Sequence, residues 1–277
     1  MTPRPLIHTA LLVTLIAIIG LATTSRTPAA EPLAQVIQPK TFPPCDKPEA
    51  LGISRIVEID TMGGPGFGFE HFKQYDFLRD KEVVLTFDDG PWPGNTPAVL
   101  KALTDNCAKA TFFEIGEHAM WHPEIAKQVA AAGMTIGSHT WSHKDLAKNP
   151  YASDLDQAKA EIEMGVSALH MAVDGPIAPF FRFPDLQHTP VLLSYLGERN
   201  IASFSTDIDS FDFKMCRPEQ VIQSVMAKLQ KRGKGIILMH DFRPGTAAAM
   251  LENCRASSRQ VATRLCTWCR RRRSRRW

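Results

Sequence analysis

The chain has 277 residues, of which 44% are hydrophobic, and these values suit one large globular domain rather than a fibrous or disordered protein. The formal net charge is +3, but the last eight residues hold six arginines and no acid, so the rest of the chain is slightly acidic. This distribution argues against a nucleic-acid-binding surface outside the tail.

A thirteen-residue apolar run, residues 10–22, lies near the N-terminus and is followed by sequence rich in Thr, Ser and Ala. Because this run is short for a membrane-spanning helix, residues 1–30 are predicted to be a secretory signal peptide. The alternative is an uncleaved N-terminal anchor, the one case in which we expect membrane contact. Either way the protein is expected to be exported, as a periplasmic, secreted or outward-facing anchored protein. Export permits one disulfide, and the sequence leaves its pairing open among Cys45, Cys107 and Cys216.

Residues 31–80 form an N-terminal extension punctuated by Pro and Gly, with one expected strand at 55–59. From residue 82 onward, short apolar runs alternate with helical patterns. Strands are expected at 83–87, 110–114, 134–138, 179–182, 201–206 and 235–239, and helices at 96–106, 123–132, 153–171, 189–199 and 218–231. This alternation predicts an α/β fold with a parallel sheet covered by helices, either open or closed into a (β/α) barrel.

Two adjacent carboxylates, Asp88 and Asp89, follow the apolar run 83–87. Neighbouring carboxylates that face one cavity repel each other unless a cation lies between them, so the pair predicts a positive partner. The alternative is a solvated Asp-Asp turn. His139 and His143 have a spacing that puts both imidazoles on one side of a helical turn, which suits a divalent metal or an ordinary polar surface turn.

Polar residues also follow several other expected strands. In α/β barrels the C-terminal ends of the strands form the active face, so side chains from distant parts of the sequence are expected to meet there. The residues in question are Asp88, Asp89, His139, Arg182, Asp207, Asp209 and His240.

Five short motifs give the sequence a specific resemblance. TFDDGP (86–91), SHTWSH (138–143), RFP (182–184), DSFDF (209–213) and LMH (238–240) are similar in order and rough spacing to the motifs of the polysaccharide deacetylases. That family is carbohydrate esterase family four, with the NodB-homology domain. The resemblance spans about residues 82–241, implies a polysaccharide deacetylase domain at 81–250, and implies a distorted (β/α) barrel.

The resemblance implies a role for each matching residue. Asp89, His139 and His143 match the metal ligands, and the metal is usually zinc, with cobalt and manganese as alternatives. The catalytic residues implied are Asp88 as general base, Arg182 orienting that base, His240 as general acid and Asp212 paired with that acid. The substrate-binding residues implied are Pro184, Asp185, Phe211, Phe213 and Leu238.

The implied activity is hydrolysis of N-acetyl groups from a glycan that contains GlcNAc, of the chitooligosaccharide or peptidoglycan type, with release of acetate. An acetylated glycan is therefore the expected partner, and the sequence predicts no oligomeric state. One alternative is an O-acetyl esterase acting on a polysaccharide. The other is a metal-dependent glycan-binding domain without catalysis. Two departures bear on substrate preference, because Asp185 stands where the family usually has tyrosine and Phe213 where tryptophan is common.

The tail, residues 251–277, is rich in Arg and Cys and departs from the family. The family closes with a helix and a final strand, whereas this segment has no apolar period and no strand signal before its arginines. If this segment is the product of a frameshift, the barrel is expected to lack its last strand. The tail is interpreted either as the product of a frameshift or as a basic patch for an anionic polymer.

Overall fold

The computed structural model describes residues 45–47, 50–253 and 264–270. All of them belong to one compact unit, Leu33–Trp277. The segment predicted to be a signal peptide, residues 1–30, lies outside the described residues. None of the helices in the described ranges is long and apolar enough to cross a membrane.

The elements largely follow the alternation expected from the sequence. The strands are β1 (Arg55–Ile59), β2 (Gly66–Phe67), β3 (Glu82–Asp88), β4 (Thr111–Glu114), β5 (Thr135–Ser138), β6 (Phe180–Phe181), β7 (Ala202–Phe204), β8 (Ile208–Asp209), β9 (Gly235–His240) and β10 (Arg264–Arg270). The helices are α1 (Asn95–Asp105), α2 (Gly116–Trp121), α3 (Pro123–Ala131), α4 (Leu155–Val173), α5 (Pro190–Glu198), α6 (Pro218–Arg232) and α7 (Pro244–Asn253), with 3-10 turns η1 (Pro184–Leu186) and η2 (Asp212–Lys214). Elements β2, β8, β10, α2 and α7 were not expected from the sequence.

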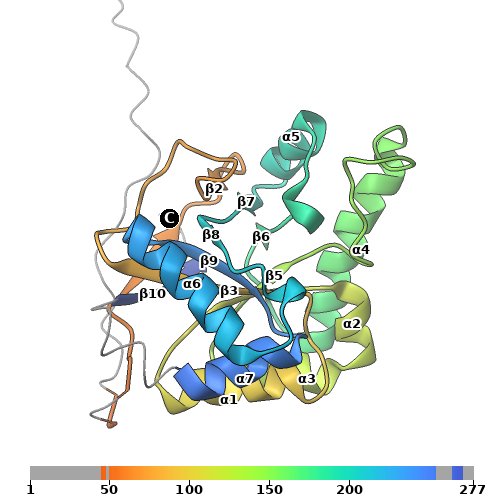
Figure 1. The fold of residues 1–277 in the computed structure, drawn as a ribbon. Helices are drawn as coiled ribbons and strands as arrows, with labels where there is room; N and C mark the ends of the chain where they lie inside the picture. The colour runs from red at the N-terminus through yellow and green to blue at the C-terminus, as the bar shows by residue number, and fades with distance from the viewer. Residues whose placement is uncertain (1–44, 48–49, 254–263, 271–277) are drawn as a thin grey trace, which may run out of the picture. The chain divides into compact units, whose positions relative to one another are not determined.

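The strands form one curled parallel sheet, and β3 is its central strand. The order is β1-β10-β3-β4-β5-β6-β7-β2, while β9 pairs with the other side of β3 and β8 pairs with β9. Helices α1, α3 and α7 lie together beneath the sheet, α6 crosses its front, and α2 and α4 cover one flank (Figure 1). This arrangement confirms the distorted (β/α) barrel.

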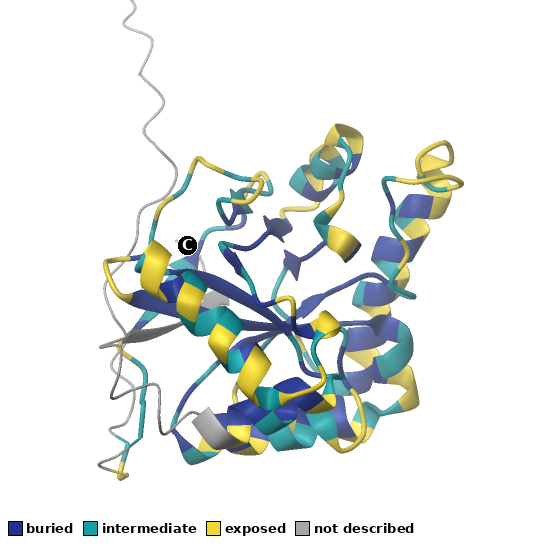
Figure 2. Cartoon of the chain, in the orientation of Figure 1, coloured by how far each residue is buried: buried dark blue, intermediate teal, exposed yellow. Residues whose placement is uncertain are grey.

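Alternation along β3 explains which side chains face the interior of the curled sheet. Val83 and Phe87 pack into the core shared with α1 and α7, whereas Val84 belongs to a second core inside the curl. Because successive strand residues point to opposite faces, Thr86 and Asp88 share the inner face with Val84. The strands are accordingly buried, and exposed residues gather on the outer faces of the helices (Figure 2).

Local sequence signals explain where two of the helices begin. The Asp154 side chain accepts a hydrogen bond from the Gln157 backbone N–H (3.0 Å) and caps α4. Thr189 caps α5 in the same way through Leu192, and Pro190 occupies the first helical position, where a missing N–H costs nothing.

Strand β10 differs from the sequence-based expectation that the last strand is missing. It lies between β1 and β3, in parallel register with Arg55–Ile59 on one side and Glu82–Val84 on the other. The facing edges of β1 and β3 carry backbone groups that need hydrogen-bond partners, and β10 supplies them. Such tertiary pairing overrides the weak local strand propensity of this segment. The remainder of the tail, residues 254–263 and 271–277, lies outside the described residues.

The described part of the N-terminal extension is built into the same sheet. Strand β1 pairs with β10, and β2 pairs with β7. A disulfide joins Cys45 to Cys107 after α1, and Cys216 is an exposed free thiol. The structure thus selects one of the cysteine pairings that the sequence left open.

Candidate active site

The two adjacent aspartates occupy different environments at the end of β3. Asp88 is the last strand residue and is 2% exposed, on the inner face of the curl. Asp89 follows with φ of +73°, a left-handed conformation that turns its carboxylate away from the strand direction. A Cβ on the next residue, Gly90, would lie 2.5 Å from the carboxylate of Asp241, so only glycine fits at this point.

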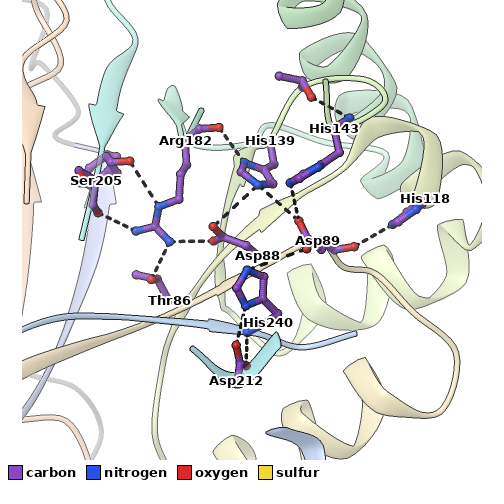
Figure 3. Close-up of polar contacts among 12 residues, drawn as sticks. Thr86, Asp88, Asp89, His118, His139, His143, Arg182, Ser205, Asp212 and His240 are labelled. Carbon is purple, nitrogen blue, oxygen red and sulfur yellow. Dashed lines mark hydrogen bonds and ion pairs between the residues drawn. The ribbon is translucent and has the colours of Figure 1, made fainter. Parts of the chain in front are cut away.

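Asp89 meets the two histidines of the second motif. Its Oδ1 lies 3.4 Å from Nε2 of His139 and 3.2 Å from Nε2 of His143 (Figure 3). Nδ1 of His139 lies 2.7 Å from the carbonyl oxygen of Arg182 and must donate to it. This bond keeps a proton on Nδ1, so that Nε2 is the nitrogen free to hold a metal between the three side chains.

These three side chains fit a divalent metal. Their ligand atoms all lie within 4.8 Å of one another, and Oδ1 of Asp89 is buried without a hydrogen-bond partner. Burial, reinforced by His139, lowers the pKa of His143, so its imidazole is neutral near pH 7. Burial alone would lower the pKa of His139, but Asp88 and Asp89 outweigh it and raise the pKa, so a bound metal would have to displace a proton from this ring. Two deprotonated imidazoles and one carboxylate are a donor set that zinc prefers, with room for further ligands.

The loop that carries both histidines packs closely on α4. A Cβ on Gly165 would lie 2.5 Å from the backbone of Thr140, so the helix can approach this far only with glycine. The Thr140 hydroxyl in turn accepts a hydrogen bond from the backbone N–H of His143 (3.0 Å). The second histidine is therefore positioned by its own loop.

Asp88 is held by a buried arginine. Arg182 is fully buried, and its Nη1 donates to Oδ1 of Asp88 at 2.7 Å and to the Thr86 hydroxyl at 2.8 Å. Its Nη2 donates to the carbonyl oxygen of Ser205 at 2.9 Å. Oδ2 of Asp88 lies on the other side, 3.8 Å from Nε2 of His139. One oxygen of this carboxylate is thus oriented by the arginine while the other faces the triad.

His240 ends β9 and lies beside Asp88 in the strand register. Its Nδ1 lies 2.6 Å from Oδ1 of Asp212, and its backbone N–H donates to Oδ2 at 2.7 Å. Burial alone would lower the pKa of His240, but the bond to Asp212 outweighs it and raises the pKa to about 9. The imidazole is therefore protonated at neutral pH, with Nε2 4.0 Å from Oδ2 of Asp89.

The residues expected to bind substrate near His240 differ in how far they are exposed to solvent. Phe211 and Phe213 are 40% and 41% exposed, and the Phe213 ring centroid lies 5.6 Å from that of His240. Leu238 is buried and shares a strand face with His240, two residues away. The exposed Phe213 ring therefore adjoins the imidazole, and the Phe211 ring centroid lies 5.9 Å from that of Phe213.

The third motif turns sharply after Arg182. Pro184 is buried and opens η1, while Asp185 is exposed with φ of +53°. Burial lowers the pKa of His143, and the Asp185 carboxylate is one of the negative charges that partly oppose this effect. The structure thus keeps a negative charge near the site where the family usually has a tyrosine.

Comparison with known proteins agrees with this geometry. The family model described as polysaccharide deacetylase matches residues 77–202. A chitooligosaccharide deacetylase of Azorhizobium caulinodans is 32% identical over 176 residues, covering 62% of this chain and 79% of that protein. The chain belongs to the polysaccharide deacetylase family. The expectation of an enzyme of this class is therefore confirmed.

Other members of the family include cell-wall enzymes. A peptidoglycan-N-acetylglucosamine deacetylase of Bacillus cereus is 32% identical, with 59% of this chain and 57% of that protein covered. The solved structure of a Bdellovibrio bacteriovorus peptidoglycan deacetylase superposes with a TM-score of 0.70 at 27% identity. That alignment covers 84% of this polysaccharide deacetylase and 64% of the solved chain.

Two residues that support the triad of this deacetylase were missed in the sequence. Nδ1 of His118, on α2, donates to the carbonyl oxygen of Asp89 at 2.7 Å. Glu161, on α4, accepts hydrogen bonds from the backbone N–H (3.0 Å) and hydroxyl (2.9 Å) of Ser142, between the two histidines. Nothing in the local pattern around His118 or Glu161 distinguishes them from ordinary helix residues.

A second pair of buried acids lies behind the site of the deacetylase. Glu114 ends β4 with neither carboxylate oxygen hydrogen-bonded, and burial, followed by the charge of Asp241, raises its pKa well above the usual range. Asp241 accepts a hydrogen bond from the Thr96 hydroxyl, and burial raises its pKa to about 7. A protonated Glu114 adds no negative charge to the site near neutral pH.

Proposed function

We propose that this deacetylase is a metal-dependent hydrolase that removes N-acetyl groups from a glycan containing GlcNAc, of the chitooligosaccharide or peptidoglycan type. The observation that carries the proposal is the convergence of three chemically distinct groups at the ends of neighbouring strands. They are the triad of Asp89, His139 and His143, the arginine-bound carboxylate of Asp88, and the protonated imidazole of His240.

Each group has a defined part in the proposed reaction. A divalent metal held by the triad, with zinc as the first choice, would supply Lewis acidity toward a water molecule and the acetyl carbonyl oxygen. Asp88 accepts a proton from the attacking water through the oxygen that Arg182 leaves free. The bond from Arg182 to the other oxygen keeps this carboxylate from rotating and keeps its charge compensated.

The second half of the reaction requires a proton donor. As the carbon–nitrogen bond breaks, the His240 imidazolium donates its Nε2 proton to the departing amine nitrogen, and acetate is released. Asp212 keeps this imidazole protonated and directs Nε2 into the site. The backbone N–H of Asp185 is the proposed donor to the developing oxyanion, because a main-chain donor survives the change from tyrosine to aspartate.

Three further assignments belong to the same proposal. Phe211, Phe213 and Leu238 are proposed to contact the sugar beside His240, and Pro184 to shape the turn that presents Asp185. The signal-peptide interpretation of residues 1–30 supports an exported protein. Outside the cytoplasm, a glycan of the cell wall or its surroundings is accessible to such a protein. A purely glycan-binding role is disfavoured, because a binder needs neither an arginine-held base nor a protonated histidine.

The deciding experiment measures acetate release from N-acetylchitooligosaccharides by the zinc-loaded protein, by the chelator-treated protein and by the Asp88→Asn variant. Release that requires zinc and falls by about a thousandfold in Asp88→Asn supports the reaction and its base. Asp105→Asn, an exposed acid on α1, is the matched control and should leave the rate unchanged. Undiminished release by Asp88→Asn would contradict the mechanism, and release from an O-acetylated polysaccharide alone would replace the amide substrate with an ester.

A further inference from the structure

A group of exposed aromatic side chains lies beside the triad without taking part in it. Trp92 follows the first motif directly and is 36% exposed, and Trp121 at the end of α2 is 55% exposed. An exposed tryptophan leaves a large apolar surface in contact with water, and tryptophan is enriched where proteins bind partners. We call these two residues the tryptophan pair.

One histidine connects the tryptophan pair to the triad. The His118 ring centroid lies 5.1 Å from that of Trp92 and 5.3 Å from that of Trp121. The same ring donates through Nδ1 to the carbonyl oxygen of Asp89, as Figure 3 shows. The tryptophan pair is therefore separated from a proposed metal ligand by a single side chain.

The tryptophan pair and the two phenylalanines lie on different sides of the reacting point. Phe213 adjoins His240 at the end of β9, whereas α2 begins just after the end of β4. Strands β4 and β9 pair with opposite edges of β3, which delivers Asp88 and Asp89. Aromatic surfaces thus extend away from the site in two directions, as an extended chain molecule would require.

We propose that the tryptophan pair binds sugar rings of the same glycan chain on the β4 side, beyond the sugar that carries the reacting N-acetyl group. This inference rests on the proposed function and specifies its substrate as a chain of at least three sugars. The C–H faces of pyranose rings are apolar and match an indole face, while His118 and His122 offer ring nitrogens to the hydroxyl edges.

The charges near the tryptophan pair favour a neutral sugar. The acidic residues in the first turns of α2 and α3 are Glu117 and Glu124, and Nδ1 of His122 lies 4.0 Å from a carboxylate oxygen of Glu124. An anionic chain on this side would meet like charges, which disfavours its binding. The occupant is therefore a neutral run of N-acetylated sugars rather than an acidic polymer.

The test compares short and long substrates in matched surface variants. Trp121→Ala removes one exposed ring. Met171→Ala is the control, because Met171 is 70% exposed near the C-terminal end of α4, where the helix leads back to the N-terminal ends of the strands. We expect Trp121→Ala to lower kcat/KM about tenfold for the GlcNAc hexamer, equivalent to about 1.4 kcal/mol, and much less for the dimer. Met171→Ala should leave both values unchanged.

A binding measurement separates this inference from the proposed function. In the Asp88→Asn background, tryptophan fluorescence is titrated with the GlcNAc hexamer and dimer, and the hexamer should bind about tenfold more tightly until Trp121 is replaced. This result is informative even if no variant releases acetate. Equal losses for dimer and hexamer would overturn the inference. The inference would also be overturned if Trp121→Ala changed the protein from dimer to monomer and left hexamer binding intact. The tryptophan pair would then be an interface between two copies of this chain.

Discussion

The bond between Asp212 and His240 predicts how the enzyme responds to alkaline pH. Against the effect of burial, Asp212 and, to a smaller extent, Asp89 and Asp88 raise the pKa of His240 from its usual 6.5 to about 9. Each unit of pKa shift corresponds to about 1.36 kcal/mol, so the folded protein favours the protonated over the neutral imidazole by about 3 kcal/mol more than an unperturbed histidine does. As the proposed general acid, an imidazole with a raised pKa keeps its proton through neutral pH, and its loss on the alkaline side sets the alkaline limb of the activity profile.

The informative variant is Asp212→Asn. The amide preserves the size of the side chain and still accepts hydrogen bonds, but it removes the negative charge 2.6 Å from Nδ1 of His240. An opposite charge at this distance shifts a pKa by about one to three units, so the alkaline limb of kcat/KM should move to lower pH by that amount. The charge of a bound metal acts on His240 in both proteins, and the difference between them therefore isolates Asp212.

Stability should follow the same linkage. Because the folded-state pKa of His240 is raised, the pair stabilises the fold fully below pH 6.5, and this contribution is lost as the pH rises through about 9. Asp212→Asn should therefore cost up to about 3 kcal/mol in the free energy of unfolding at pH 6 and lose that cost by pH 10.

Two measurements check the prediction. The first is kcat/KM of zinc-saturated enzyme between pH 5 and pH 10, and the second is urea unfolding at pH 6 and at pH 10. Asp105→Asn is again the control, since its carboxylate lies on the exposed face of α1 and should leave both profiles as in the wild type. An alkaline limb at the same pH in the wild type and in Asp212→Asn would refute the assignment of His240 as the general acid.

Two further predictions concern parts of the fold that support the site. His118→Ala should weaken zinc binding about tenfold in competition with a chelator, because it frees the Asp89 carbonyl, whereas His170→Ala, which loses a similar bond to a carbonyl in an exposed turn, should not. Replacing Cys45 and Cys107 by serine opens a loop of 62 residues and should lower the free energy of unfolding by about 4 kcal/mol in urea; an unchanged midpoint would contradict the disulfide.

The fold of the central strands could be predicted because local pattern and tertiary position agree there. The apolar run 83–87 becomes β3, and the two carboxylates stand at its end as expected. The residues implied as metal ligands come together for a topological reason, since β5 and the strands on its path to β3 are all parallel and end on one edge. Their order in the sequence therefore places them at one edge of the sheet, and the left-handed φ of Asp89 then turns its carboxylate toward the imidazoles.

Other features depend on contacts that no local pattern encodes. Strand β10 forms in the gap between β1 and β3, so its place is decided by its neighbours rather than by its own residues. His118 and Glu161 lie on helices with unremarkable sequences, and each acquires a role only because its helix packs against a loop of the site. The pairing of Cys45 with Cys107 likewise needs the extension to reach the end of α1.

The step from Asp88 to Asp89 shows how one backbone angle separates two roles. In a regular strand the second carboxylate would point to the opposite face, into the core that contains Phe87. With φ of +73°, Asp89 instead turns toward the imidazoles, a conformation that costs about 1–3 kcal/mol in a residue other than glycine. The bond from His118 to its carbonyl and a metal on its carboxylate would offset that cost. Asp88 stays in the strand conformation and is reached by Arg182, so neighbouring identical side chains are suited to different chemistry.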